Sequence, residues 1–357
     1  MADDAEPADP VGAAFDYHRR HPEISIDDHY QARAFDLGER VARRKTVYLD
    51  TRYWILLRDV QMGRGHEPVC RRLLDALRER VKAGRIVCPV SSDAFTEILS
   101  QTDMITRVAT CELMDTLSDR TAIQPEAERV PTELLHCITR LYSGEASVRP
   151  LRRLVWTAPI YVLGCVFPVS EAFSPEEHLV MQKAYMDHVW TTGFAAPAKV
   201  LPSRHLPDRP WERLADKMNQ WNEAHHGSAR SFRQAHAQEF AGAIDFYLPQ
   251  LEDILRYKYF KATGRDVARE DGQEAQASAR RLGALLVKAF RRGKIGAKIP
   301  TLMVRSNLAA AVRWNRGRRY KANDFHDFGH AAVEELQTDN GPADYGLVVD
   351  GRLLGIL

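Results

Sequence analysis

The sequence predicts an α/β fold in which helices cover a central parallel sheet. Three apolar runs of strand length, residues 45–50, 85–90 and 345–350, are separated by segments in which apolar residues recur every three or four positions. The first two runs are each followed by such a helical segment. Strands that alternate with helices form parallel sheets, because each helix carries the chain back to the start of the next strand.

The pattern divides the chain into four parts. Residues 1–43 form an acidic tail and a helix, and residues 44–144 hold the first two strands with their helices. Residues 145–280 are mostly helical in pattern, rich in Trp, His and Gln and interrupted by prolines, which indicates a large helical insertion. Residues 281–357 return to helices and a closing strand. We therefore expect a core built from two separate stretches of the chain.

Helix limits follow from capping residues as well as from periodicity. Gly84 ends one helix, since glycine is common just past a helix C-terminus, and Ser91 or Ser92 provides the N-cap of the next. Pro300 begins a late helix, because its missing N–H is not needed in a first turn. These signals predict helices around Glu97 and Asp327 and over residues 27–44, 53–60, 69–83, 104–117, 134–141, 151–155, 279–290 and 300–312.

Four acidic residues share one kind of setting in this scheme. Asp50 ends the first apolar run, Glu97 opens the helix after the second, Asp327 lies in the first turn of a late helix, and Asp350 ends the third run. Strand ends and helix starts gather at one edge of an open α/β sheet, where ligands bind. Carboxylates gathered there repel each other unless a cation neutralises them, and hard oxygen ligands favour Mg²⁺ or Mn²⁺. Such a site suits phosphodiester hydrolysis by a metal-activated water.

The acids stand in recognisable sequence patterns. Tyr48-Leu49-Asp50-Thr51 is an apolar strand that ends in Asp-Thr, Glu97 lies early in a helix after a strand, Asp327 precedes the small residues Ala331 and Ala332, and Asp350 follows a short strand. This order resembles the four motifs of the PIN-domain family of metal-dependent nucleases. The resemblance covers residues 44–125 and 285–357. In one departure, Val349 stands where the family usually has Thr or Ser.

The resemblance implies a fold, a chemistry and partners. It implies a three-layer PIN-like fold with a parallel central sheet, interrupted by the helical insertion. Asp50, Glu97, Asp327 and Asp350 would be the catalytic residues and would hold one or two Mg²⁺ or Mn²⁺ ions. The activity implied is that of a nuclease, by family expectation an endoribonuclease acting on RNA. A protein inhibitor or antitoxin would be a further partner, as for PIN-type toxins.

Four neighbouring residues could support the metal ligands. Thr51 follows the first acid and His330 shares a helix face with Asp327, where it would orient a carboxylate or simply pack. Asp324 is a good N-cap with Asp327 at the third helical position, so capping alone would also account for both acids. Asp344 precedes the third strand and is either a supporting acid or a turn residue.

A basic tract leads into the third acidic motif. Residues 288–321 contain eleven Lys or Arg and no Asp or Glu. Such a tract beside an acidic metal site would hold nucleic-acid phosphates while the metal acts on one of them. The alternative is a solvated basic helix face. The predicted nucleic-acid contacts are Arg313, Arg316, Arg318, Arg319 and Lys321.

Composition excludes other classes. The net charge of +2 is too small to argue for a polyanion partner by itself. The five cysteines are scattered without a CxxC pair, and no secretory signal precedes them, which indicates reduced thiols in a cytoplasmic protein. The longest uncharged apolar stretch, residues 154–169, contains two prolines and is shorter than the roughly 20 residues that a membrane helix needs. We therefore expect no membrane association.

Two other functions are compatible with parts of the pattern. Phosphatases of the haloacid-dehalogenase kind also place an Asp after the first strand, but their chemistry needs a second acid two residues later, where this chain has Arg52. The other alternative is a catalytically inactive PIN-like scaffold that binds RNA or a partner protein, which the departure at Val349 favours. The sequence does not distinguish RNA from DNA as the nucleic acid.

Overall fold

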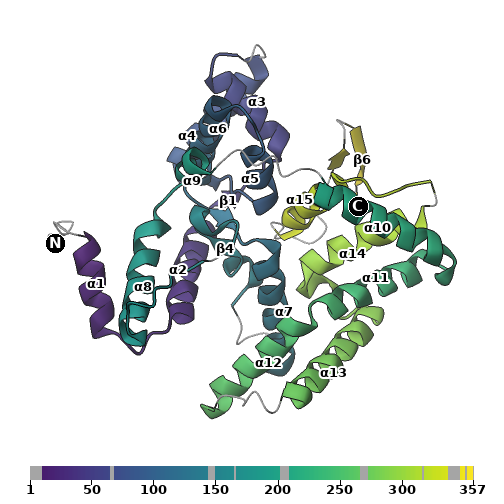
Figure 1. Cartoon of the computed structure of the whole chain (residues 1–357). Coiled ribbons are helices and arrows are strands. Elements are labelled where there is room, and N and C mark those ends of the chain that lie inside the picture. The colour runs from purple at the N-terminus through teal and green to yellow at the C-terminus, as the bar shows by residue number, and fades with distance from the viewer. Residues whose placement is uncertain are drawn as a thin grey trace. The chain divides into compact units, whose positions relative to one another are not determined.

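The computed structural model is dominated by helices (Figure 1). It describes residues 10–64, 68–143, 149–164, 166–201, 209–265, 272–315, 317–336, 346–349 and 352–356. Within these ranges there are fifteen α-helices, and the strands are two to five residues long. No helix in the described part of the chain is long and apolar enough to cross a bilayer.

The chain divides into two compact units, which are described separately below. Unit 1 comprises Met1–Thr132 and Ile138–Pro210, and unit 2 comprises Glu133–Cys137 and Trp211–Leu357. The segment Glu133–Cys137 is therefore grouped with residues far along the sequence. The reason lies in Glu133, whose buried carboxylate accepts hydrogen bonds from the backbone N–H of Thr301 at 3.0 Å and from its hydroxyl at 2.5 Å.

Most of the predicted helices are confirmed, because amphipathic periodicity and capping are local properties. The N-terminal segment is an exception, since a helix already begins at Pro10, and residues 151–155 form only a short 3₁₀ turn over Leu151–Arg153. The helices up to residue 200 are α1 (Pro10–Arg20), α2 (Ile26–Val41), α3 (Thr51–Gln61), α4 (Pro68–Lys82), α5 (Ser92–Leu99), α6 (Met104–Ser118), α7 (Glu126–Ser143), α8 (Pro175–Trp190) and α9 (Ala195–Val200). The later helices are α10 (Arg209–His225), α11 (Phe232–Phe246), α12 (Leu248–Thr263), α13 (Gly272–Arg291), α14 (Pro300–Trp314) and α15 (Asp324–Leu336).

The prediction of a three-layer fold around a central parallel sheet is wrong. The described strands form only isolated pairs: β1 (Lys45–Thr46) lies parallel to β2 (Ile86–Val87), β3 (Ala122–Ile123) lies antiparallel to β4 (Trp156–Thr157), and β5 (Gly346–Val349) lies antiparallel to β6 (Arg352–Ile356). A single parallel bridge joins Val90 to Ala122. The last run thus pairs with the segment directly after it and not with the first two runs in a parallel sheet.

The second apolar run is buried but does not form a long strand, and its hydrogen bonds show the reason. Val87, Cys88 and Val90 are fully buried, as a core strand would be. The N–H of Cys88, however, donates to the carbonyl of Leu117 near the end of α6, and the N–H of Val90 donates to Thr121. Cys88 is thus bonded to a helix end, and Val90 pairs with residues 121–123 through a single bridge, so these buried amides are satisfied without a long strand.

The core of unit 1 is a helical cluster around the β1–β2 pair. Helices α3, α4, α5 and α6 pack on one another through fully or almost fully buried side chains, among them Trp54, Leu57, Leu74, Phe95 and Met114. Each such side chain contributes roughly 1.5–3 kcal/mol by leaving water. The cluster fixes the N-terminus of α3, which Asp50 caps, and helix α5, which carries Glu97.

A second contact surface of unit 1 brings α2 against the turn over Leu151–Arg153. Gly38 lies within α2 at this contact, and a Cβ atom there would be 2.1 Å from the carbonyl oxygen of Arg153. Only glycine permits so close an approach of the two backbones. Helix α2 also packs on α8, and α1 packs on α8 as well.

The described residues of unit 2 are mostly helical, apart from the β5–β6 pair and the connecting segments. Helices α11 and α14 pack closely, α13 packs on α11 and α12, and Phe240 stacks on Phe290 with ring centroids 4.0 Å apart. A smaller cluster of Ala215, Val312 and Tyr320 with Phe328 joins α10 and α14 to the beginning of α15. This cluster supports the segment between α14 and α15, where the basic tract ends.

Candidate functional site

Asp50 is placed by the first turn of α3. It has extended backbone angles and acts as the N-cap, since its Oδ1 accepts the backbone N–H of Tyr53 at 3.0 Å. Among the described residues, Oδ2 accepts no hydrogen bond, so capping uses only one of the two carboxylate oxygens. The half-buried side chain lies at the N-terminus of a helix.

Glu97 lies next to this turn, because the hydroxyl of Thr51 donates a hydrogen bond to its Oε2. Helix α5 is fixed by Ser91, whose hydroxyl accepts the N–H of Ala94 and is paired at 2.8 Å with the phenol of Tyr48. Both Thr51 and Glu97 are half-buried. The structure therefore joins Glu97 to Thr51, the residue after Asp50, and gives this predicted supporting residue a direct contact.

The acids of α15 belong to unit 2 and differ from each other in their surroundings. Asp324 is buried, and its carboxylate accepts the backbone N–H of Lys321 at 2.9 Å and the guanidinium of Arg318 at 3.4 Å. Asp327 is exposed and accepts the side-chain amide of Asn323 at 3.1 Å. Asp324 thus braces the turn that leads into α15, while Asp327 faces solvent.

The other predicted site residues are only partly described. His330 is half-buried on α15. Asp344 and Asp350 lie outside the described residues. Since Asp50 and Glu97 belong to unit 1 and Asp327 to unit 2, the convergence of all four acids stays a prediction.

The oxygen atoms of Asp50 and Glu97 are of the type that binds hard divalent cations. Two half-buried carboxylates from separate elements offer oxygen ligands of the type that Mg²⁺ and Mn²⁺ prefer. In the part of the chain that the structure describes, no third His, Cys, Asp or Glu completes a close ligand group with them. They would therefore provide a subset of the ligands, with water or further residues completing the coordination.

Arg313 is an internal residue of unit 2, although the sequence placed it in a nucleic-acid-binding tract. Its side chain is only 4% exposed and forms an ion pair with Glu239 at 2.7 Å. The guanidinium also donates to Ser228 at 2.6 Å and to Gln238 at 2.8 Å, and it lies 4.5 Å from the ring centroid of Trp221. These contacts hold α14 against α10 and α11.

The remaining basic residues of the tract are more accessible. Arg319 forms an ion pair with Glu223 in which both side chains are about two-thirds exposed. The half-exposed side chain of Arg318 reaches Asp324, and Lys321 is exposed. Arg316 lies outside the described residues. A binding role for the accessible residues stays a prediction.

A hollow of about 450 Å³ lies between α10 and the end of α14 in unit 2. Its lining includes Asn222 and Glu223 from α10 and, from the segment after α14, Asn315, Arg318 and Arg319. Two large aromatic side chains on these helices are also accessible, Trp221 with 42% and Trp314 with 46% of the residue surface exposed. Guanidinium and amide donors beside exposed indole rings can contact phosphates and stack on unpaired bases.

Several of these residues were not predicted as site residues. Trp221 and Asn222 fall in a segment noted only for its high Trp, His and Gln content, and no spacing rule singles them out. A further group in unit 1 joins Asp187 to His18 and His29, each of which lies more than 150 positions earlier in the sequence. Only the packing of helices brings such residues together.

Comparison with models of known protein families, with curated proteins and with solved structures gives no match. The resemblance to the PIN-domain motifs therefore stays a prediction.

Proposed function

We propose that the chain is a metal-dependent nuclease that hydrolyses phosphodiester bonds of RNA, with Asp50 and Glu97 among its metal-binding carboxylates. The main support is the hydrogen bond from Thr51, the residue that follows Asp50, to Glu97, because 46 positions separate the two residues in sequence. Helix capping does not explain the contact between Thr51 and Glu97, because Asp50 already caps α3 and Ser91 already caps α5.

The residues around the pair have distinct tasks in this proposal. The N–H of Tyr53 fixes one oxygen of Asp50 and leaves the other for a cation. The hydroxyl of Thr51 orients Glu97, as hydrogen-bonding partners commonly do for metal ligands. A bound Mg²⁺ or Mn²⁺ would supply a water of lowered pKa and would neutralise charge on the leaving oxygen.

Unit 2 offers the surface on which the nucleic acid would bind. The lining of its hollow includes Arg318, Arg319 and Asn222, with Lys321 and the exposed Trp314 on the adjoining segments. The cations would hold phosphates, and the indole would stack on an unpaired base. This assignment omits Arg313, since its guanidinium is engaged inside the unit.

The decisive experiment measures Mn²⁺-dependent cleavage of a labelled single-stranded RNA. Asp50→Asn should abolish cleavage and preserve the fold, because Asn caps helices as well as Asp does. Thr51→Val should lower activity or metal affinity by about 10- to 100-fold through misorientation of Glu97. The matched control is Asp75→Asn, which neutralises an exposed acid on α4 of the same unit and should leave the rate unchanged. Cleavage by Asp50→Asn at the wild-type rate would refute the assignment.

A second candidate function, binding of RNA without cleavage, is favoured by the hollow and its aromatic neighbours in unit 2. It predicts that wild-type protein binds the RNA but that metal-dependent cleavage is absent. In either case, reversing the charges of Arg318 and Arg319 should flatten the salt dependence of binding by about 0.7 per lost phosphate contact. An unchanged slope, measured with Asp50→Asn protein to prevent cleavage, would place the nucleic acid elsewhere.

A further inference from the structure

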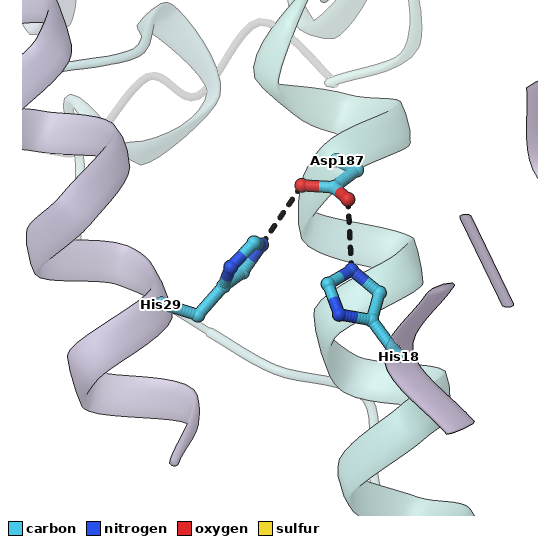
Figure 2. Close-up of side chains that lie close together, drawn as sticks. All are labelled: His18, His29 and Asp187. Atoms are coloured by element: carbon cyan, nitrogen blue, oxygen red, sulfur yellow. Dashed lines mark hydrogen bonds and ion pairs between the residues drawn. The ribbon is translucent and has the colours of Figure 1, made fainter. Parts of the chain in front are cut away.

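Two histidines and one aspartate of unit 1 converge where α1, α2 and α8 pack together (Figure 2). His18 points at Asp187 from α1, with its Nε2 atom 2.8 Å from Oδ2, and His29 points at it from α2, with its Nε2 atom 2.8 Å from Oδ1. One potential ligand atom from each residue lies within 4.8 Å of the other two. In the described part of the chain, this is the one group of three such residues close enough to share an ion.

The group combines a buried base with an accessible side. The side chain of His18 is fully buried, whereas His29 and Asp187 retain 13% and 19% of their side-chain exposure. The Nδ1 atom of His18 is buried and has no hydrogen-bond partner in the described structure. Hydrogen bonding therefore uses only the nitrogen that faces Asp187, and solvent can reach the group from the side of His29.

The donor atoms of the group suit a metal ligand set. It offers two imidazole nitrogens and one carboxylate, and His18, His29 and Arg33 all lie within hydrogen-bond distance of that carboxylate.

Two cationic side chains lie close to the group, and each is already held by oxygen atoms. Arg33 donates from its Nε atom to Oδ1 of Asp187 at 2.9 Å and from a terminal nitrogen to the same oxygen. Oδ2 remains for an ion, while Arg33 would hold the carboxylate from outside, as partners of metal-bound carboxylates do. The ammonium of Lys183 donates to the carbonyls of His21 and Ile24, at 2.8 and 2.9 Å.

We propose that His18, His29 and Asp187 bind one Zn²⁺ ion through both Nε2 atoms and a carboxylate oxygen, with water in the fourth position. Two imidazoles and a carboxylate form a known three-ligand set for zinc, and imidazole ligands favour zinc over Mg²⁺. Bonds of about 2.0–2.1 Å in a tetrahedral site place ligand atoms roughly 3.3 Å apart. Small side-chain rotations from the present 2.8 Å contacts would reach this spacing.

Zinc titration of the metal-free full-length chain tests the site without reference to RNA cleavage. Calorimetry should find one Zn²⁺ fewer per chain in Asp187→Asn and in His29→Gln than in the wild type. Zinc should also raise the Tm of the wild type by more than that of either variant, because an ion that binds only the folded state stabilises it. His29→Gln provides the test at the more exposed ligand if Asp187→Asn does not fold.

Two controls separate a metal site from a hydrogen-bonded group. His21→Ala removes a nearby exposed histidine that pairs with Glu23, and it should bind zinc as the wild type does. Arg33→Gln removes two hydrogen bonds to Asp187 but no ligand, so its zinc stoichiometry should also be unchanged. Equal zinc stoichiometry in the wild type and in both ligand variants would show that the three residues form a hydrogen-bonded group only.

Discussion

Replacing Arg313 by methionine should strongly destabilise unit 2 and should weaken RNA binding only through the fold. Methionine retains the aliphatic body of the side chain but removes the guanidinium. The substitution leaves Glu239, which is 14% exposed, without its cation, and it removes the donors to Ser228 and Gln238. Breaking a buried ion pair by removing one partner costs about 3–5 kcal/mol.

Urea denaturation followed by circular dichroism measures this effect. With an m value of about 2 kcal/mol/M, a loss of about 4 kcal/mol would lower the urea midpoint by roughly 2 M. Glu239→Gln in the Arg313→Met background should restore part of the loss, because it removes the carboxylate that was left unpaired. At urea concentrations where the variant remains folded, its RNA affinity should equal that of the wild type.

Arg319→Met is the matched control from the same basic tract. Its ion pair with Glu223 is exposed on both sides, so the loss should be at most about 1 kcal/mol. This variant should instead weaken RNA binding at unchanged stability. If Arg313→Met lowered the urea midpoint no more than Arg319→Met, the buried network would not have the structural role assigned to it.

Three further predictions concern stability. Gly193→Ala should lower the Tm of unit 1, because a Cβ atom there would lie 2.3 Å from Oδ1 of Asp115; an unchanged Tm would contradict this packing. Glu133→Gln should cost about 1–3 kcal/mol, since an amide cannot accept both hydrogen bonds from Thr301, and urea midpoints will show whether it does. Burial lowers the pKa of His236, so stability should fall as the pH drops below about 6.5, where the unfolded chain gains a proton that the native histidine does not. His236→Gln should flatten that dependence in urea midpoints measured between about pH 5 and pH 7.5, and an identical pH profile would refute the assignment.

The helices could be predicted from the sequence because their signals are short-range. Apolar spacing over residues 69–83 and 104–117 corresponds to α4 and α6, and Pro300 opens α14 as expected. The sheet could not be predicted in this way, since a buried apolar run is compatible with several backbone partners. In residues 85–90 the hydrogen bonds go to β1, to the end of α6 and to residues 121–123, and those partners are set by packing rather than by the run itself.

The candidate site shows the same division between local and long-range information. Asp50 and the helix that carries Glu97 were predicted from capping and strand-end patterns, and both are placed by caps that act within four residues, on Tyr53 and Ala94. These caps form although the described residues contain no central sheet, because a cap needs only its own helix. The roles of Arg313 and Asp187 depend instead on partners 74 or more positions away. From the sequence, a charged residue in a basic tract is predicted to face solvent. Only the packed structure shows that a buried carboxylate lies opposite such a residue.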